Sequence, residues 1–289
     1  MLQKEKSTWL IGVDLDGTLL DKKGKLPKKN IEVIKKLSKK GHKVVIITGR
    51  PYRSSKFVYD DLGLDTIIAN HNGAVIHNPS DPGFVKIETS LNREIIKEFL
   101  NDPILNNNIQ NFAVESKTKL FIKERDKWLE DFFFVKGAVE LIECSTKEIL
   151  KKKLDIDPYS MLILLKSKYS NDEISRIILE LKTKYGETFM MRSWQHPEIN
   201  NQIVLEINPI STDKFKALNK IRSYYNIHNH KTMTFGDGLN DVQMLHKSQY
   251  GIVMLNANES VRLFGNDLTF SDNNDAGVGK YLEKWFQLK

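Results

Sequence analysis

The chain has 289 residues, 40% hydrophobic and 28% charged, which is typical of a globular protein and long enough for two domains. No run reaches the roughly 18 apolar residues of a membrane span, and the apolar stretch near the N-terminus is too short for a signal peptide. The single cysteine, Cys144, excludes an intramolecular disulfide and suits a reducing compartment. We therefore expect a cytoplasmic protein without a membrane partner, in which Cys144 is a small, partly buried side chain.

The charge of the chain is basic, with a formal net charge of +7 and a sequence pI of about 9.1. Only 8 of the 44 basic residues are arginines, and the lysines are spread along the chain in short runs such as 151–153. Arginine is the residue preferred for bidentate recognition of bases and phosphates. The composition therefore favours a solvated lysine surface over a nucleic-acid site, and we predict no nucleic-acid partner.

The first 75 residues alternate predicted strands and helices. Pro27 and Pro51 stand near the starts of two amphipathic or apolar helical stretches, and Asn72-Gly73 is a hairpin signal. Alternation of this kind predicts βαβ units, and hence a parallel sheet with right-handed crossovers. In chain order the predicted elements are strand 9–13, helix 27–37, strand 44–47, helix 51–62 and strand 66–69.

The character of the chain changes at 77–83, where two prolines and a glycine among polar residues mark a linker. Beyond it we predict an inserted α+β domain over 85–207. The triple Phe132-Phe133-Phe134 is a binding patch or, more simply, a packing cluster. The elements predicted in this insertion are helix 92–100, strand 161–165, helix 171–185, and two antiparallel strands at 187–192 and 202–207.

The α/β pattern then resumes, so the predicted fold class is α/β, with a discontinuous core of residues 1–84 and 208–289. Ser211 or Thr212 is expected to cap the first helix of the second core segment. The elements predicted here are helix 211–225, strand 232–235, helix 241–246, strand 251–255, strand 267–270 and a C-terminal helix that ends at Lys289.

Acidic and hydroxyl side chains follow the predicted strands directly. Asp14 and Asp16 follow the first strand, Thr48 the second, and Asp237 a later one. The carboxyl ends of parallel strands share one edge of the sheet, where ligands bind in open α/β folds. Two carboxylates ~4 Å apart repel by about 4 kcal/mol at an effective dielectric constant near 20. Their convergence therefore predicts a cation that offsets the repulsion.

Three nearby positions have both a structural and a functional interpretation. Thr48 either caps the following helix or donates to an anion at the helix N-terminus. Lys214 lies in the first turn of a helix, where a cation is disfavoured, so a nearby anion explains it better, although Asp213 compensates in part. Asp241 is either a helix-capping acid or a member of the acidic group. Carboxylates, a lysine and a helix N-terminus together indicate Mg²⁺ and phosphoryl transfer.

Four segments resemble the motifs of the haloacid dehalogenase superfamily in order and spacing. They are Asp14-Leu15-Asp16-Gly17-Thr18, Thr48-Gly49-Arg50, Lys214, and Gly236-Asp237-Gly238-Leu239-Asn240-Asp241. A single insertion of about 120 residues between the second and third segments is similar to that of the Cof-type phosphatases, which carry a C2-type cap. Further similarities lie at 72–74, 206–209 and 256–257.

The resemblance implies a Rossmann-like core with a parallel sheet, an inserted α+β cap that sets specificity, and a defined set of catalytic residues. Asp14 would be the nucleophile that forms an aspartyl-phosphate, and Asp16 the general acid and then base. Thr48 and the Gly49 amide would hold phosphate oxygens, and Lys214 would neutralise developing charge. The full substrate-binding set implied is Leu15, Thr48, Gly49, Lys214 and Asn240.

The implied cofactor is Mg²⁺, bound by Asp14, the main-chain carbonyl of Asp16, and Asp237. Asp241 would assist directly or through water, and Asn240 would orient Lys214 or a phosphate oxygen. The implied function is a Mg²⁺-dependent phosphatase that acts on a small phosphorylated metabolite, such as a sugar phosphate, a nucleotide or a cofactor phosphate. We expect a monomer or a weak homodimer.

Other functions use similar residues. A sugar-phosphate phosphomutase would share the motifs but transfer phosphate without releasing it. A phospho-aspartate receiver module has a similar residue set, but it is normally an uninterrupted domain of about half this length. A non-catalytic phospho-ligand binder would be expected to lack one of the four acids. An oligonucleotide binder would show salt-sensitive binding that Asp14→Asn does not change.

Some positions bear on substrate contacts rather than on the chemistry. Leu239, Phe215 and Leu255 stand where the family often has a glutamate or glycines. Four residues near the return from the insertion are either structural or face the leaving group: Arg192, Trp194, His196 and Glu198.

Overall fold

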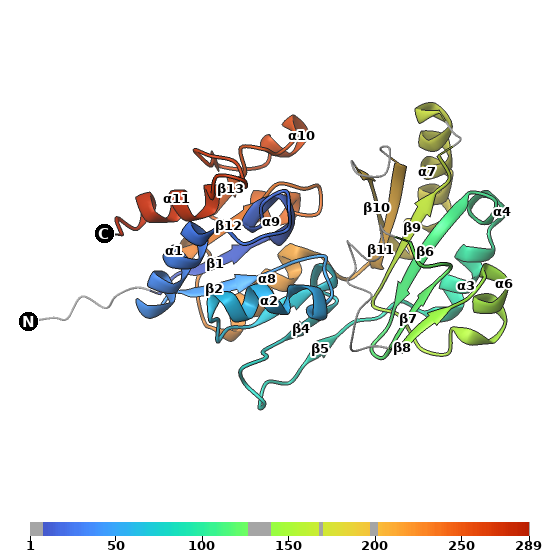
Figure 1. Cartoon of the computed structure of the whole chain (residues 1–289), viewed down its shortest axis with the longest axis horizontal. Coiled ribbons are helices and arrows are strands. Elements are labelled where there is room, and N and C mark those ends of the chain that lie inside the picture. Colours follow the sequence, from blue (N-terminus) through green and yellow to red (C-terminus); the bar gives the residue numbers. More distant parts are fainter. Residues whose placement is uncertain (1–7, 127–139, 168–169, 197–201, 289) are drawn as a thin grey trace, which may run out of the picture. The chain divides into compact units, whose positions relative to one another are not determined.

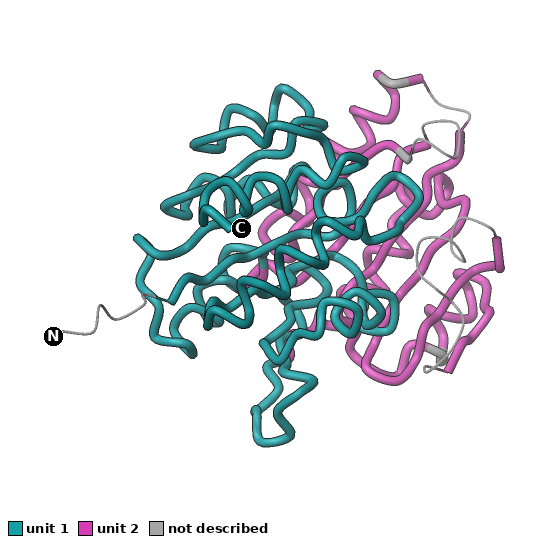
Figure 2. The backbone as a smooth tube through the Cα atoms, turned by 60° about the vertical axis from the view of Figure 1, so that its left-hand side comes forward, with its two compact units in different colours: residues 1–87, 213–289 teal, residues 88–212 magenta. Residues whose placement is uncertain are grey.

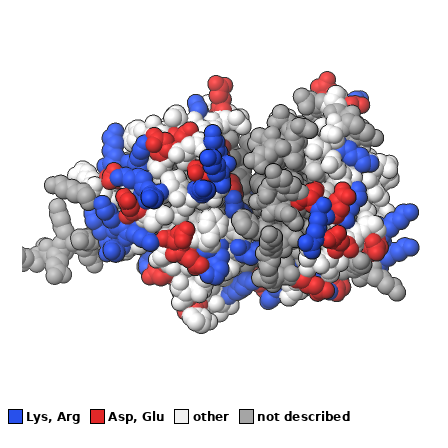
Figure 3. Space-filling view, in the orientation of Figure 1, with Lys and Arg blue, Asp and Glu red and all other residues white. Residues whose placement is uncertain are grey.

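The computed structural model of the chain describes residues 8–126, 140–167, 170–196 and 202–288 (Figure 1). It divides into two compact units, one of residues 1–87 and 213–289 and the other of residues 88–212 (Figure 2). Among the described helices, none is long and apolar enough to cross a bilayer. On the face shown in Figure 3, Lys and Arg side chains are interspersed with Asp and Glu side chains.

The first unit is built on a five-stranded parallel sheet in the order β14-β13-β12-β1-β2. The register pairs Val13 at the end of β1 with Phe235 on one side and Ile46 on the other. Strands β12, β1 and β2 therefore end level to within one residue, and the residues that follow them lie at one edge of the sheet. The strands are β1 (Leu10–Val13), β2 (Lys43–Ile46), β12 (Thr232–Gly236), β13 (Tyr250–Val253) and β14 (Asp267–Leu268).

Helices cover both faces of this sheet because alternate strand residues point to opposite sides. Ile11 and Val13 belong to a core that includes the buried faces of α1, α2 and α11. Leu10 belongs to a second core with α8 and α9. The helices are α1 (Lys28–Lys39), α2 (Tyr52–Leu62), α8 (Lys214–Tyr224), α9 (Val242–Lys247), α10 (Glu259–Arg262) and α11 (Gly277–Trp285). The predicted α/β core is confirmed.

Two predicted elements of this unit have different bounds in the structure. The strand expected at 66–69 is β3 (Ile68–Asn70), which meets β2 through an isolated parallel bridge between Ile47 and Ala69. The hairpin signal at Asn72-Gly73 is confirmed, because the chain reverses over residues 71–74 and β3 pairs with the antiparallel strand β4 (Val75–His77). Strand β5 (Ile87–Glu88) follows in the same small sheet. The C-terminal helix ends at Trp285 rather than Lys289, since Phe286 leaves the helix to pack edge-on against Trp9.

The second unit contains a six-stranded sheet in the order β10-β11-β9-β6-β7-β8. All neighbours are antiparallel except β7 and β8. The strands are β6 (Ile109–Glu115), β7 (Lys119–Ile122), β8 (Glu140–Glu143), β9 (Ser160–Leu165), β10 (Phe189–His196) and β11 (Gln202–Pro209). The α+β character predicted for the insertion is confirmed.

Helices pack on one face of this second sheet, around a core that includes Phe112, Ile163 and the buried Cys144. The predicted helix 171–185 is confirmed, and a capping box between Ser170 and Glu173 starts it. The helices are α3 (Arg93–Asn101), α4 (Pro103–Asn106), α6 (Thr146–Glu148), the irregular turn η3 (Ile149–Lys153) and α7 (Asn171–Tyr185). The triple at 132–134 lies outside the described residues.

Candidate active site

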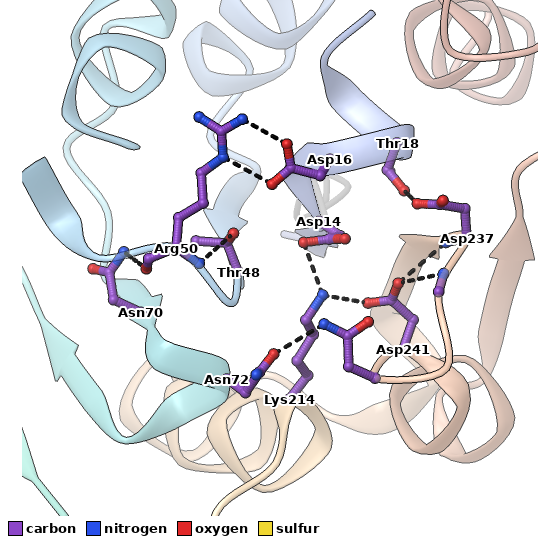
Figure 4. A network of polar contacts seen from close by, with 12 residues as sticks. Asp14, Asp16, Thr18, Thr48, Arg50, Asn70, Asn72, Lys214, Asp237 and Asp241 are labelled. Atoms are coloured by element: carbon purple, nitrogen blue, oxygen red, sulfur yellow. Dashed lines mark hydrogen bonds and ion pairs between the residues drawn. The ribbon is translucent and has the colours of Figure 1, made fainter. Parts of the chain in front are cut away.

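Asp14 and its turn lie at the carboxyl end of β1, between β12 and β2 of the parallel sheet, and Figure 4 shows Asp14 among the polar side chains of the site. Asp14 is 5% exposed, and its main-chain N–H donates to the carbonyl of Phe235 (3.2 Å). The turn Leu15–Leu19 then carries the chain away from the sheet, with Gly17 at φ 70°. Leu15 places its side chain in the core, so any contact of Leu15 with a phosphate would come from its main chain.

Lys214 is a fully buried cation that lies between two carboxylates. Its Nζ is 2.8 Å from Oδ1 of Asp14 and 2.7 Å from Oδ1 of Asp241. The prediction that Ser211 or Thr212 caps α8 is wrong, because Asp213 is the N-cap and accepts from the Lys216 N–H (2.7 Å). Lys214 is thus the first residue of the helix, and its side chain is directed into the sheet edge rather than to solvent.

The loop after β12 is held by Asp241. Its Oδ2 accepts from the main-chain N–H groups of Asp237 (3.1 Å) and Gly238 (3.0 Å), while Oδ1 accepts from Lys214. Although Asp241 directly precedes α9, its side chain makes no helix-capping hydrogen bond. The helix-capping interpretation of Asp241 is therefore wrong. Asp237 is instead anchored through its own Oδ1, which accepts from the hydroxyl of Thr18 (2.7 Å).

Thr48 lies just beyond β2 and is fully buried. Its Oγ1 accepts from the Arg50 N–H (3.1 Å), which leaves the hydroxyl proton to donate elsewhere. Helix α2 has Pro51 as its N-cap, so the interpretation of Thr48 as the cap of that helix is wrong. Gly49, between Thr48 and Arg50, is partly exposed.

Asn240 and Asn72 form a second polar pair at the site, and Figure 4 shows Asn72 beside Lys214. Nδ2 of Asn240 donates to Oδ1 of Asn72 (3.0 Å), and the Asn72 N–H donates to the carbonyl of Thr48 (2.9 Å). Asn72 is buried at φ 53°, in the left-handed region that asparagine tolerates better than most residues. Gly73 follows at φ 96°, where an added Cβ would lie 2.8 Å from Cβ of Ala217. The Asn-Gly pair therefore serves this site as well as turning the chain.

The carboxylates of the site carry more negative charge than Lys214 balances. Burial, and next the charge of Asp241, raise the pKa of Asp14 well above its ordinary value, while Lys214 opposes the shift. Burial and Asp241 likewise raise the pKa of Asp237 to about 7, with the Thr18 hydrogen bond opposing. Burial alone would lower the pKa of Lys214, but Asp14 and Asp241 raise it, so this lysine stays charged.

A cation would fit this acidic group. Asp14, Asp237 and Asp241 each offer a carboxylate oxygen, and these oxygens lie within 4.8 Å of one another. Oxygen ligands of this kind suit Mg²⁺, which takes one or two protein carboxylates and keeps several waters. Both oxygens of Asp241 already accept hydrogen bonds, whereas Oδ2 of Asp237 faces Gly17, so Asp14 and Asp237 are the better placed direct ligands.

The raised pKa values predict that the metal-free protein loses stability as the pH rises. Between the ordinary carboxyl value of 3.8 and about 7, folded Asp237 keeps its proton while the unfolded residue has lost it. The free energy of unfolding should therefore fall by roughly 2 to 4 kcal/mol from pH 4 to pH 8 in EDTA. Urea unfolding of the wild type and Asp237→Asn at both pH values measures this. If the free energy of unfolding falls equally with pH in the two proteins, Asp237 is not the cause of the fall. Added Mg²⁺ should reduce the loss of stability at pH 8.

Three residues at the site were not assigned a role from the sequence: Thr18, Arg50 and Asn72. Thr18 and Arg50 stood within the recognised segments, but a side-chain contact across about 30 or 200 residues has no local signal. Asn72 was interpreted only as a turn residue.

The residues singled out in the second unit are only partly described. Arg192 Nη1 donates to Oδ1 of Asn208 (3.2 Å), and Trp194 packs against an apolar cluster on the second face of the sheet. For His196 only the place in β10 is given, and Glu198 lies outside the described residues.

Comparison with known proteins agrees with this geometry. The model of the haloacid dehalogenase-like hydrolase family matches residues 11–282. A relative from Metamycoplasma hominis is 32% identical over 283 residues, covering 97% of this chain and 98% of its own. The 5-amino-6-(5-phospho-D-ribitylamino)uracil phosphatase YitU of Bacillus subtilis is 31% identical over 284 residues, covering 98% and 100%. A haloacid dehalogenase-like hydrolase of Bacteroides thetaiotaomicron has the same fold, with a TM-score of 0.75 at 20% identity, covering 97% and 100%.

The chain belongs to the haloacid dehalogenase-like hydrolases, and the resemblance inferred from its four segments is confirmed. Within that family it is a phosphatase.

Proposed function

We propose that the protein is a Mg²⁺-dependent phosphatase that works through an aspartyl-phosphate on Asp14. The observation that carries this proposal is the burial of Lys214 between Asp14 and Asp241, at 2.8 and 2.7 Å, beside a third carboxylate, Asp237. A nucleophilic carboxylate needs a cationic surrounding to approach a phosphate dianion, and this arrangement supplies one such cation and ligands for a second.

Mg²⁺ would be held by Asp14, Asp237 and the main-chain carbonyl of Asp16, and it would neutralise the charge of phosphate oxygens during the transfer. Asp241 would support these ligands through its hydrogen bonds to the loop after β12 and to Lys214. Lys214 contacts the same Asp14 carboxylate that would bind Mg²⁺, and so holds that carboxylate in one orientation. Its retained proton also keeps one positive charge next to the oxygen that attacks phosphorus.

In the first step, an oxygen of Asp14 attacks phosphorus and the bond from phosphorus to the leaving oxygen breaks. Asp16 gives that oxygen a proton, so the product leaves as a neutral alcohol. Thr48 is placed to donate its hydroxyl proton to a phosphate oxygen, because its lone pair already accepts from Arg50. In the second step, Asp16 takes a proton from water, which attacks phosphorus and returns Asp14 to its free carboxylate.

We further propose that residues 85–207 form the cap that selects the substrate and that residues 1–84 and 208–289 form the catalytic core. The substrate would be a small phosphorylated metabolite. Because the Bacillus subtilis relative YitU is named for 5-amino-6-(5-phospho-D-ribitylamino)uracil, that phosphate is the first compound to test.

Release of inorganic phosphate from a panel of phosphometabolites, with that pyrimidine phosphate included, tests the proposal. We expect turnover with Mg²⁺, loss of turnover in EDTA and recovery when Mg²⁺ is restored. A protein that moves phosphate between sugar positions with little release would be a phosphomutase. Turnover that EDTA leaves unchanged would refute the Mg²⁺ requirement.

Gly17→Ala should strongly impair this activity, because the loop leaves no room for a side chain. An added Cβ at Gly17 would lie 2.1 Å from Oδ2 of Asp237. Displacing that carboxylate should lower kcat/KM by about 10²-fold, as misplacement by 1 Å can. Gly24→Ala is the matched control, since Gly24 has φ 69° against 70° for Gly17 but no neighbour within 4 Å. Equal activity of the two variants would contradict the prediction.

A further inference from the structure

Arg50 contacts both carboxylate oxygens of Asp16. Its Nε donates to Oδ2 (2.8 Å) and its Nη2 to Oδ1 (2.5 Å), a bidentate fork that Figure 4 shows beside Thr48. Such pairs fix direction as well as distance, because two parallel hydrogen bonds allow only one relative orientation of the two planar groups. The position of the Asp16 carboxylate is therefore set by Arg50.

The two partners are unequally anchored. The Asp16 side chain is 43% exposed and that of Arg50 is 11% exposed. Arg50 is tied at several further points: Nη1 donates to the carbonyl of Ser54 (3.1 Å), its N–H donates to Thr48, and its carbonyl accepts from Asn70 Nδ2 (2.9 Å). Arg50 is thus the fixed member of the pair.

The backbone around Asp16 gives its carboxylate little support of its own. Asp16 has the extended dihedral angles φ −72° and ψ 128° within the turn, and Gly17 follows at φ 70°. A side chain on such a turn has several accessible rotamers, and holding one of them costs conformational entropy. The guanidinium of Arg50 offsets that cost through its two hydrogen bonds and holds the carboxylate in one orientation.

We propose that Arg50 is the positioning residue for the general acid and base of this phosphatase. It orients Asp16 so that one carboxyl oxygen is directed at the leaving oxygen in the first step and at water in the second. The proposal rests on the role proposed above for Asp16. Arg50 acts through Asp16 and need not contact the substrate.

A structural role and a positioning role for Arg50 predict different losses of activity when Arg50 is replaced. A purely structural tie between the turn after β1 and the start of α2 would support Asp14 and Thr48 alike, so its loss would impair every substrate equally. A positioning role affects only proton transfer to the leaving group, and so depends on how basic that group is.

The test compares two synthetic substrates that differ in their need for a proton. Departure of 2,4-dinitrophenolate needs no proton, whereas departure of an alkoxide from a simple alkyl phosphate does. Arg50→Gln should lower kcat/KM for the alkyl phosphate by about 10²-fold and that for 2,4-dinitrophenyl phosphate by less than about threefold. In an Asp16→Asn background, Arg50→Gln should cause no further selective loss.

Arg222→Gln is the matched control, because Arg222 is a hydrogen-bonded arginine of the same unit that donates to Asn229 (2.8 Å). Its kcat/KM should equal that of the wild type on both substrates. Equal losses on the two substrates in Arg50→Gln, or no loss, would overturn the proposal. If Arg50→Gln does not fold, Arg50→Lys, which cannot form the fork, must show the same selectivity or the proposal fails. A wild type inactive on both substrates would instead refute the proposed function, and this inference with it.

Discussion

Asp14→Asn should reduce phosphate release by at least about 10⁴-fold, because the amide cannot attack phosphorus and no aspartyl-phosphate can form. The substitution keeps the shape of a side chain that is 5% exposed, so the core around β1 should remain packed. It also removes a buried negative charge whose pKa is raised by burial and by Asp241. In EDTA at neutral pH, the melting temperature of the variant should therefore equal or exceed that of the wild type.

Two measurements distinguish this loss from unfolding. Thermal denaturation of Asp14→Asn reports its stability, and a phosphate-release assay with the preferred substrate reports its turnover. Asp102→Asn is the matched control, since Asp102 is another buried carboxylate that pairs with a lysine, Lys184 (2.6 Å), but lies in the second unit. That control should lose stability and keep its turnover. Turnover retained by Asp14→Asn would contradict the nucleophilic role.

Much of the site was predictable because it depends on the edge of a parallel sheet. Residues that follow neighbouring parallel strands lie at one edge of the sheet, and the register of β1 with β2 and β12 shows that these strands end level to within one residue. The structure accordingly brings Asp14, Asp237 and Thr48 to one edge. Lys214 was predictable for another reason, since a lysine in the first turn of a helix needs an anion nearby.

What could not be predicted depends on which side chains meet once the strands are in place. Arg50 and Asp16 are 34 positions apart, and their fork depends on rotamers that no local pattern determines. The predicted N-cap of α8 was wrong because Ser211, Thr212 and Asp213 are all good N-cap residues. Only the path of the chain into the helix selects among them.

Lys214→Met should be the most destabilising single change at the site. Methionine fills much of the volume of a lysine that is fully buried, but it leaves Asp14 and Asp241 facing each other without their shared cation. Removing one partner of a buried ion pair costs about 3–5 kcal/mol, which corresponds to a fall of roughly 10 °C in melting temperature. The phosphatase activity should also be lost, because Lys214 orients the attacking carboxylate.

The dependence of this loss on pH identifies its cause. Without Lys214, the burial that raises the pKa of Asp14 is opposed less, so the variant should take up a proton there more readily than the wild type. At low pH, protonation of Asp14 removes the buried negative charge from folded Lys214→Met. The difference in free energy of unfolding between the wild type and the variant should therefore be smaller at pH 5 than at pH 8. Lys184→Met is the control: Lys184 pairs with Asp102 but is 59% exposed, so its removal should lower the stability much less. A deficit in Lys214→Met that is as small as this, or that is constant with pH, would show that the buried carboxylates do not depend on Lys214.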